Sequence, residues 1–170
     1  DFDPVAYMDA KSARRMDRFA QLAVAAGKMA VEDAKLPLAA DGNDRIGAII
    51  ASGVGGLKTF EEQVAVLLER GPTRVSPLFI PMMIANMAAA QVSMTLGLRG
   101  PLSCPVTACA SGNHAIGDAL EAIRRGHADA MLAGGAEASV CRIGYAGFIA
   151  CRAMSTSFNE TPERASRPYD

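Results

Sequence analysis

A single cysteine stands where one expected element ends and the next begins. Cys109 comes three residues after the apolar run 102–106 and two residues before the helical pattern 111–125. Unpaired N–H groups and the dipole at a helix start stabilise a thiolate, and the small residues of 108–112 allow the sharp turn of a nucleophile elbow. The backbone N–H groups of such a turn can also form part of an oxyanion hole. This spacing is typical of a catalytic nucleophile, although a structural cysteine before an ordinary helix shares it.

The other cysteines show no spacing that a metal site would need. The four cysteines are irregularly placed without a CxxC pair, whereas zinc sites require closely patterned ligands. We therefore expect no metal ion. The remaining three cysteines are interpreted as reduced thiols that pack as small hydrophobic side chains: Cys104, Cys141 and Cys151.

Three further polar residues near these patterns are interpreted as structural. His114 lies roughly 140° around the helix from Cys109, so it does not share the face of the thiol. His127 comes at the expected end of that helix. Glu137 follows Gly134-Gly135, where we expect it to orient neighbouring backbone rather than to act in catalysis.

Elements of two kinds alternate along the chain and must position these residues. Short apolar runs bounded by turn residues predict buried strands over 46–51, 102–106 and 130–133. Apolar residues at helical spacing predict helices over 15–35, 58–70, 81–97 and 111–125, and within 140–152. Strands that alternate with helices require crossover connections, which predicts an α/β fold with a mainly parallel sheet between helices.

Composition and charge exclude several classes of protein. Half of the 170 residues are hydrophobic, which is enough for the core of one domain. The net charge of −1 lacks the basic excess of a nucleic-acid-binding protein, and no run of about 20 apolar residues predicts a membrane span. The first residues resemble no signal peptide and the last are polar. We expect one cytoplasmic domain over 1–170, truncated at both ends.

Three motifs occur in a fixed order and carry a family resemblance: Gly97-Leu98-Arg99-Gly100-Pro101, Thr107-Ala108-Cys109-Ala110-Ser111-Gly112 and Ala133-Gly134-Gly135-Ala136-Glu137. From Arg14 to Pro168 the chain resembles the β-ketoacyl-acyl-carrier-protein synthases, most of all the type II elongating enzymes of fatty acid synthesis. Modular polyketide ketosynthases usually carry a run of serines after the cysteine, and chain-length-factor relatives lack the cysteine altogether. This chain keeps Cys109 and follows it with Ala110-Ser111-Gly112.

The resemblance implies both a fold and a reaction. The fold is thiolase-like, with two similar halves that each hold a mixed five-stranded sheet, and this chain covers an incomplete N-terminal half. The reaction is a decarboxylative Claisen condensation, in which Cys109 accepts an acyl group from acyl carrier protein and malonyl-carrier protein then supplies the carbanion. The only prosthetic group is the 4'-phosphopantetheine of the carrier. Two catalytic histidines, a lysine and a gating phenylalanine belong to the second half, so the isolated chain is expected not to condense.

Individual positions also match the family pattern. The resemblance places four residues along the acyl pocket, with Val54 at the bend of the channel, Phe79 reaching toward the pocket of a partner subunit, and Gly144 and Phe148 beside the pocket. Four basic residues match positions that meet the carrier protein or its phosphate: Arg14, Arg15, Arg74 and Arg152. Thr73 stands where the family has another basic residue. By residue type alone, all of these are ordinary core or solvated positions.

The resemblance also implies a homodimer that pairs through residues 100–107. Two other interpretations stay open. One is a different thiolase-fold acyltransferase, such as a thiolase or an initiating synthase that uses coenzyme A. The other is a non-catalytic partner subunit that only shapes a tunnel, which retention of Cys109 disfavours.

Overall fold

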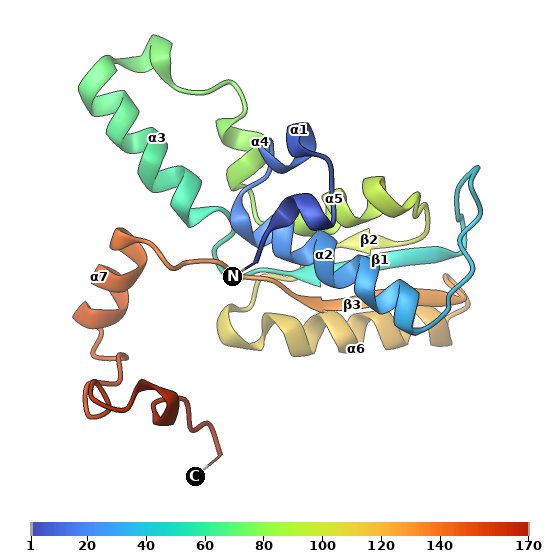
Figure 1. Cartoon of the computed structure of the whole chain (residues 1–170). Coiled ribbons are helices and arrows are strands. Elements are labelled where there is room, and N and C mark those ends of the chain that lie inside the picture. The colour runs from blue at the N-terminus through green and yellow to red at the C-terminus, as the bar shows by residue number, and fades with distance from the viewer. Residues whose placement is uncertain (1, 170) are drawn as a thin grey trace.

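A short parallel sheet runs through the middle of the molecule (Figure 1). Its strands are β1 (Ile46–Ala51), β2 (Leu102–Ser103) and β3 (Ala130–Gly135), in the order β2-β1-β3. The computed structural model describes residues 2–169, and all the strand pairs among them are parallel. The prediction of a mainly parallel α/β sheet is therefore confirmed.

Helices cover both faces of this sheet. The helices α2 (Arg18–Asp33) and α5 (Met87–Leu96) lie together on one face, and α6 (Ser111–Arg124) packs against β1 and β3 on the other (Figure 1). Phe19, Val24 and Val92 are the largest fully buried side chains, and they fill the layer between α2, α5 and the sheet. Because both faces are covered, β1 is apolar along its whole length, as a strand in a buried parallel sheet must be.

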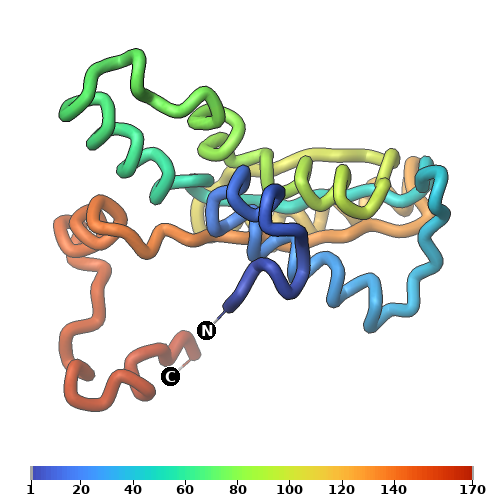
Figure 2. Tube along the Cα trace, turned by 45° about the horizontal axis from the view of Figure 1, so that its top comes forward, coloured from blue at the N-terminus to red at the C-terminus, as the bar shows by residue number. Residues whose placement is uncertain are grey.

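The remaining helices lie around one end of the sheet. They are α1 (Ala10–Ala13), α3 (Leu57–Arg70), α4 (Phe79–Met83) and α7 (Arg142–Ala150). Short 3₁₀ helices occur at η1 (Pro4–Ala6), η2 (Pro72–Arg74), η3 (Ala108–Ala110) and η4 (Pro162–Arg164). Figures 1 and 2 show α3 and α7 extending away from the sheet, with the C-terminal segment continuing beyond α7. None of the helices within residues 2–169 is long and apolar enough to cross a membrane.

The continuous helix expected over 81–97 is wrong, because the chain breaks between α4 and α5. At the break, Ile84 has extended backbone angles, and the carbonyl of Met83 accepts a hydrogen bond from the N–H of Gly56 at 2.9 Å. Gly55 has a φ of 79°, and a Cβ there would lie 2.5 Å from the same carbonyl oxygen. The loop after β1 therefore packs directly into the break, and this contact is not visible in the local pattern.

The strand expected over 102–106 is also much shorter and less buried than predicted. Only Leu102–Ser103 pairs with β1, and Leu102 and Val106 are 49% and 56% exposed. The strand lies at the edge of the sheet, and Pro105 has no N–H with which to extend the pairing. By contrast, β3 runs past its predicted end at 133, because Gly134 and Gly135 still pair with β1.

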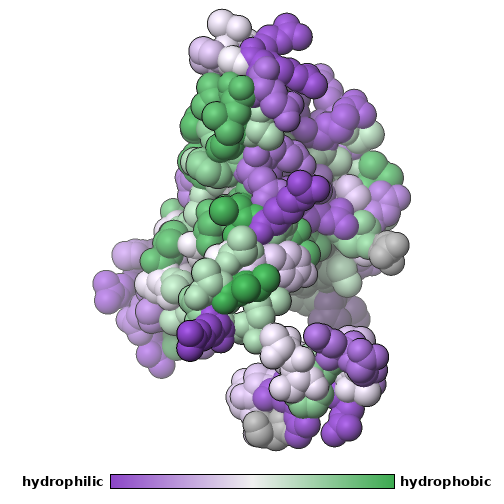
Figure 3. All heavy atoms as spheres, turned by 90° about the vertical axis from the view of Figure 1, so that its left-hand side faces the viewer, coloured by the Kyte–Doolittle hydropathy of each residue, from purple (hydrophilic) through white to green (hydrophobic). Residues whose placement is uncertain are grey.

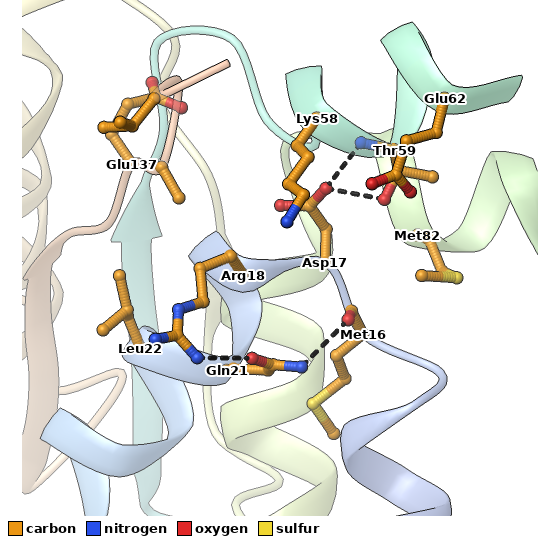
Figure 4. A pocket seen from close by; sticks show the side chains of 12 residues that line it. Met16, Asp17, Arg18, Gln21, Leu22, Lys58, Thr59, Glu62, Met82 and Glu137 are labelled. Carbon is orange, nitrogen blue, oxygen red and sulfur yellow. Dashed lines mark hydrogen bonds between the residues drawn. The ribbon is translucent and has the colours of Figure 1, made fainter. Parts of the chain in front are cut away.

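A buried carboxylate connects the starts of α2 and α3. Asp17 caps α2 by accepting a hydrogen bond from the N–H of Phe19 at 3.2 Å. Its other oxygen accepts from the N–H and the hydroxyl of Thr59 in α3, at 2.9 and 2.6 Å (Figure 4). Both residues are buried. Asp17 therefore fixes the start of α3 relative to α2.

We predict that Asp17→Ala lowers the free energy of unfolding by about 2–4 kcal/mol, because the substitution removes a cap and leaves two buried donors of Thr59 unpaired. Chemical denaturation followed by circular dichroism measures this change. Asp33→Ala, at the exposed end of the same helix, is the matched control and should change the value by less than about 0.5 kcal/mol. Equal effects of the two variants would contradict this role of Asp17.

Candidate active site

The segment that carries Cys109 is a tight elbow closed by side-chain hydrogen bonds. Ala108 adopts a left-handed conformation with φ of 51°, which costs an L-residue about 1–2 kcal/mol. The buried hydroxyl of Ser111 accepts a hydrogen bond from the N–H of Thr107 at 2.8 Å and donates one to the carbonyl of Ala108 at 2.7 Å. Cys109 itself is exposed. The predicted turn between strand and helix is confirmed, and Ser111 holds it in a strained form.

His114 contributes to the same turn. Its Nδ1 lies 2.7 Å from the hydroxyl of Thr107, within hydrogen-bond distance. This contact joins the first turn of α6 to the residue at which the elbow begins. The expectation of a structural histidine agrees with this hydrogen bond.

Cys109 lines a cavity of about 450 Å³ at the end of the sheet. The walls come from the loop after β1, the elbow, the end of β3 and one side chain of α7. Two predicted pocket residues, Val54 and Phe148, lie in these walls. Small residues form most of the rest: Ala51, Ser52, Gly53, Ala108, Ser111, Gly112, Gly135, Ala136 and Ser139, together with Glu137. A largely apolar cavity beside a thiol suits an apolar substrate better than a polar one.

The other two predicted pocket residues do not line this cavity. Gly144 is buried where α7 crosses the preceding loop, and a Cβ there would lie 2.1 Å from the carbonyl oxygen of Ser139. Its role within this chain is therefore close packing. Phe79 lies at the start of α4 and packs against Phe60 of α3, with ring centroids 5.9 Å apart. It remains half-buried, so part of its ring is free for a further contact.

The four predicted docking arginines come from three separate segments. Arg14 and Arg15 lie between α1 and α2, Arg74 ends η2, and Arg152 follows α7 with φ of 58°. All four are exposed, and none forms an ion pair within residues 2–169. Their guanidinium groups are therefore available to an anionic partner.

Glu137 ties the two strand ends together, which confirms its expected role in orienting backbone. Its carboxylate accepts hydrogen bonds from the N–H groups of Gly53 and Val54 at 2.8 and 3.0 Å. It also accepts one from the hydroxyl of Ser52 at 3.3 Å. Ser52 is a site residue that sequence reasoning missed. Its partner lies 85 positions away, so no local pattern marks it.

The remaining cysteines differ from one another in burial. Cys104 is half-buried, its thiol lies 3.4 Å from the carbonyl oxygen of Ala85, and burial raises the pKa of this thiol. It therefore stays protonated in neutral solution. Cys141 is also half-buried, whereas Cys151 is exposed. The prediction that all three pack inside is thus wrong for Cys151, which follows the end of α7 and faces solvent.

The chain is similar over its whole length to one family of known proteins. The chain matches the family described as "Beta-ketoacyl synthase, N-terminal domain" over residues 1–170. It is 49% identical over its whole length to a 3-oxoacyl-[acyl-carrier-protein] synthase 2 from Synechocystis, and 50% identical over 163 residues to one from Staphylococcus aureus. The match covers 100% and 96% of this chain, but only 41% and 40% of those relatives.

Solved structures show the same relationship. A beta-ketoacyl synthase from Burkholderia phymatum superposes with a TM-score of 0.83 at 34% identity, covering 100% of this chain and 41% of that one. A second match is a type II polyketide synthase acyl-carrier protein in complex with its ketosynthase bound to a hexaketide. There the TM-score is 0.79 at 25% identity, over 87% of this chain and 43% of that chain.

A parallel α/β layer structure with a thiol at the elbow after an edge strand is the N-terminal part of a thiolase-like ketosynthase fold. The match over the whole sequence and the agreement with solved ketosynthases make the assignment specific. This chain belongs to the beta-ketoacyl synthase family and corresponds to its N-terminal domain.

We predict that Ser111→Ala opens the elbow. The substitution removes both hydrogen bonds of the hydroxyl, so the left-handed conformation of Ala108 loses its support and the free energy of unfolding falls by about 1–3 kcal/mol. The rate at which iodoacetamide alkylates Cys109 should fall severalfold, as read by mass spectrometry. Ser103→Ala, at an exposed position of β2, is the control. An unchanged alkylation rate in Ser111→Ala would count against the elbow as the source of thiol reactivity.

Proposed function

We propose that this chain is the N-terminal part of a 3-oxoacyl-[acyl-carrier-protein] synthase of fatty acid elongation, and that Cys109 is its acyl-accepting nucleophile. The observation that carries the proposal is the exposed thiol of Cys109 at a strained elbow, facing a cavity of about 450 Å³ with mostly small and apolar walls. The two relatives at about 50% identity carry the same named activity.

The first half-reaction needs only groups of the kind present in this chain. The sulfur of Cys109 attacks the carbonyl carbon of an acyl thioester, so a new C–S bond forms and the bond to the carrier thiol breaks. The displaced thiolate takes up the proton that Cys109 has lost. Backbone N–H groups at the elbow stabilise the oxyanion during the attack. A thiolate suits this step because it is both a strong nucleophile and a good leaving group.

The second half-reaction needs groups that these 170 residues do not supply. Malonyl-carrier protein loses CO₂, and its carbanion attacks the Cys109 thioester to form the 3-oxoacyl product. In this proposal the catalytic histidines and the lysine come from the second half of the fold. The apolar side chains Ile116, Leu120 and Ile123 form an exposed stripe on α6 and support the proposal that further structure covers this helix.

The substrate and its carrier occupy different surfaces in this proposal. The acyl chain extends from Cys109 past Val54 and Phe148, with Gly144 beside the pocket and Phe79 reaching toward the acyl pocket of a partner subunit. Arg14, Arg15, Arg74 and Arg152 face the acidic carrier protein and the phosphate of its pantetheine arm, as their exposure permits. One related ketosynthase has been solved in complex with its acyl-carrier protein.

A second copy of the protein is the other proposed partner. The unpaired outer edge of β2 and the exposed side chains of Leu102 and Val106 support pairing through residues 100–107. Figure 3 shows further hydrophobic side chains over α3 and α7, and they include Phe60, Leu68, Ile143 and Ile149. An exposed apolar surface of this kind is typical of a protein face that is covered in an assembly.

We predict that the full-length protein forms a covalent acyl adduct on Cys109 when it is incubated with acyl-carrier protein. Intact-mass spectrometry should show one added acyl group, and Cys109→Ser should abolish it. Cys151→Ser is the matched control, since Cys151 is the other exposed thiol and should leave the adduct unchanged. Acylation by acyl-coenzyme A but not by the carrier-bound donor would favour a coenzyme-A-using enzyme. Failure of both donors would favour a non-catalytic subunit.

We also predict that the isolated 170-residue chain forms no 3-oxoacyl product from acyl- and malonyl-carrier protein. The groups that promote decarboxylation are expected outside it, so the reaction stops at or before the acyl adduct. Chromatography of the products measures this outcome, with the full-length protein as the positive control. Measurable 3-oxoacyl product from the isolated chain would refute the proposal that the second half of the fold supplies the groups for decarboxylation and condensation.

A further inference from the structure

Several hydrogen bonds to a residue beyond the end of β3 help to hold the loop between β1 and α3. Three of its polar groups, from Ser52, Gly53 and Val54, donate to the carboxylate of Glu137. The buried hydroxyl of Ser52 also accepts a hydrogen bond from the N–H of Gly55 at 3.0 Å. Glu137 is therefore the common acceptor for the loop, directly and through Ser52. Figure 4 shows its side chain beside the end of β1.

Val54 lies between two cavities at the tip of this loop. It lines the cavity that contains Cys109, and it also lines a neighbouring cavity of about 210 Å³. The second cavity is apolar and is formed otherwise by Gly56, Leu57, Phe60 and Met83. An acyl chain on Cys109 that extended from the first cavity toward the second would pass the Val54 side chain. Of the residues that the structure describes, Val54 is the one that lines both of these cavities.

We propose that Glu137 is a positioning residue that sets the acyl-chain-length preference of Cys109 by fixing Val54 between these cavities. The inference rests on the proposed function. Glu137 lines the same cavity as Cys109, but its carboxylate is occupied by hydrogen bonds to the loop. Hydrogen bonds to a carboxylate are stronger than those between neutral groups, so the charge of Glu137 strengthens its hold on Gly53 and Val54.

The discriminating variant is Glu137→Gln, which keeps the size of the side chain. The N–H groups of Gly53 and Val54 donate to the same carboxylate oxygen, so a neutral amide oxygen in its place accepts weaker bonds from them, and the NH₂ group replaces the oxygen that accepts only from Ser52. Val54 is then held less tightly beside the two cavities that it lines. We expect the ratio of acylation rates for long and short acyl-carrier donors to move toward one by about three- to tenfold.

The experiment measures Cys109 acylation in the full-length protein by intact mass, over a series of acyl-carrier donors of increasing length. Glu62→Gln is the matched control, because Glu62 is an exposed carboxylate of α3 that forms no hydrogen bond to the loop within residues 2–169, and its length profile should match the wild type. In a Val54→Ala background, Glu137→Gln should have little further effect, because the side chain through which it acts is gone. Ser52→Ala provides a milder second variant with a smaller shift in the same direction.

The outcomes separate this inference from the function on which it rests. If the wild type is acylated normally and Glu137→Gln slows all donors by the same factor, Glu137 has only a structural role and the inference is overturned, while the proposed function stands. If neither Glu137→Gln nor Ser52→Ala alters the length profile, the inference is overturned as well. If the wild type accepts no donor of any length, the proposed function fails and the inference fails with it.

Discussion

The central position of β1 is the constraint on which the site depends. Its two neighbours both run parallel to it. The segments that follow the three strands therefore meet at the same end of the sheet, where the strands have their carboxyl ends. Ser52 and Val54 follow β1, Glu137 follows β3, and Cys109 lies on the elbow after β2. Crevices outside the carboxyl ends of parallel strands are the usual binding sites of α/β proteins. Helices on both faces keep the three strand ends in register.

Strained backbone at this end of the sheet is held in place by side-chain hydrogen bonds. Ala108 keeps an unfavourable left-handed conformation because the hydroxyl of Ser111 bonds to both sides of it. Gly135 at the end of β3 has no side chain, and a Cβ there would lie 3.3 Å from the Cα of Gly112. The elbow can therefore approach the strand closely. Strained backbone that the surrounding contacts maintain is common where a reactive group must be held away from its neighbours.

Polar and apolar contacts have different tasks in this arrangement. Burial of Phe19, Val24 and Val92 holds the layers together. Because this burial is not directional, it does not fix the orientation of a loop. The carboxylates of Asp17 and Glu137 act over shorter ranges and specific directions, and each joins segments far apart in sequence. Directional bonds to buried or bridging carboxylates thus orient the start of α3 and the loop before it, while hydrophobic packing holds the scaffold.

Periodicity within the sequence was sufficient to predict the main elements. The apolar run at 46–51, the amphipathic stretches at 58–70 and 111–125, and the small residues around Cys109 all form what their local patterns indicate. These predictions succeeded because backbone propensity, turn residues and burial act over a few neighbouring positions. The family motifs then identified the elbow as part of a ketosynthase, which the comparisons bear out.

Only the tertiary structure decided the features that depend on distant partners. The break between α4 and α5 arises where Gly55 and Gly56 pack against Met83. The shortness of β2 follows from its place at the sheet edge, and the exposure of Cys151 follows from how α7 ends. The pairing of Ser52 with Glu137 spans 85 positions. The sequence therefore located the reactive cysteine, whereas the fold determined which residues surround it. Contacts across the sheet join residues that are far apart in the chain, so they produce no periodic pattern from which they could be predicted.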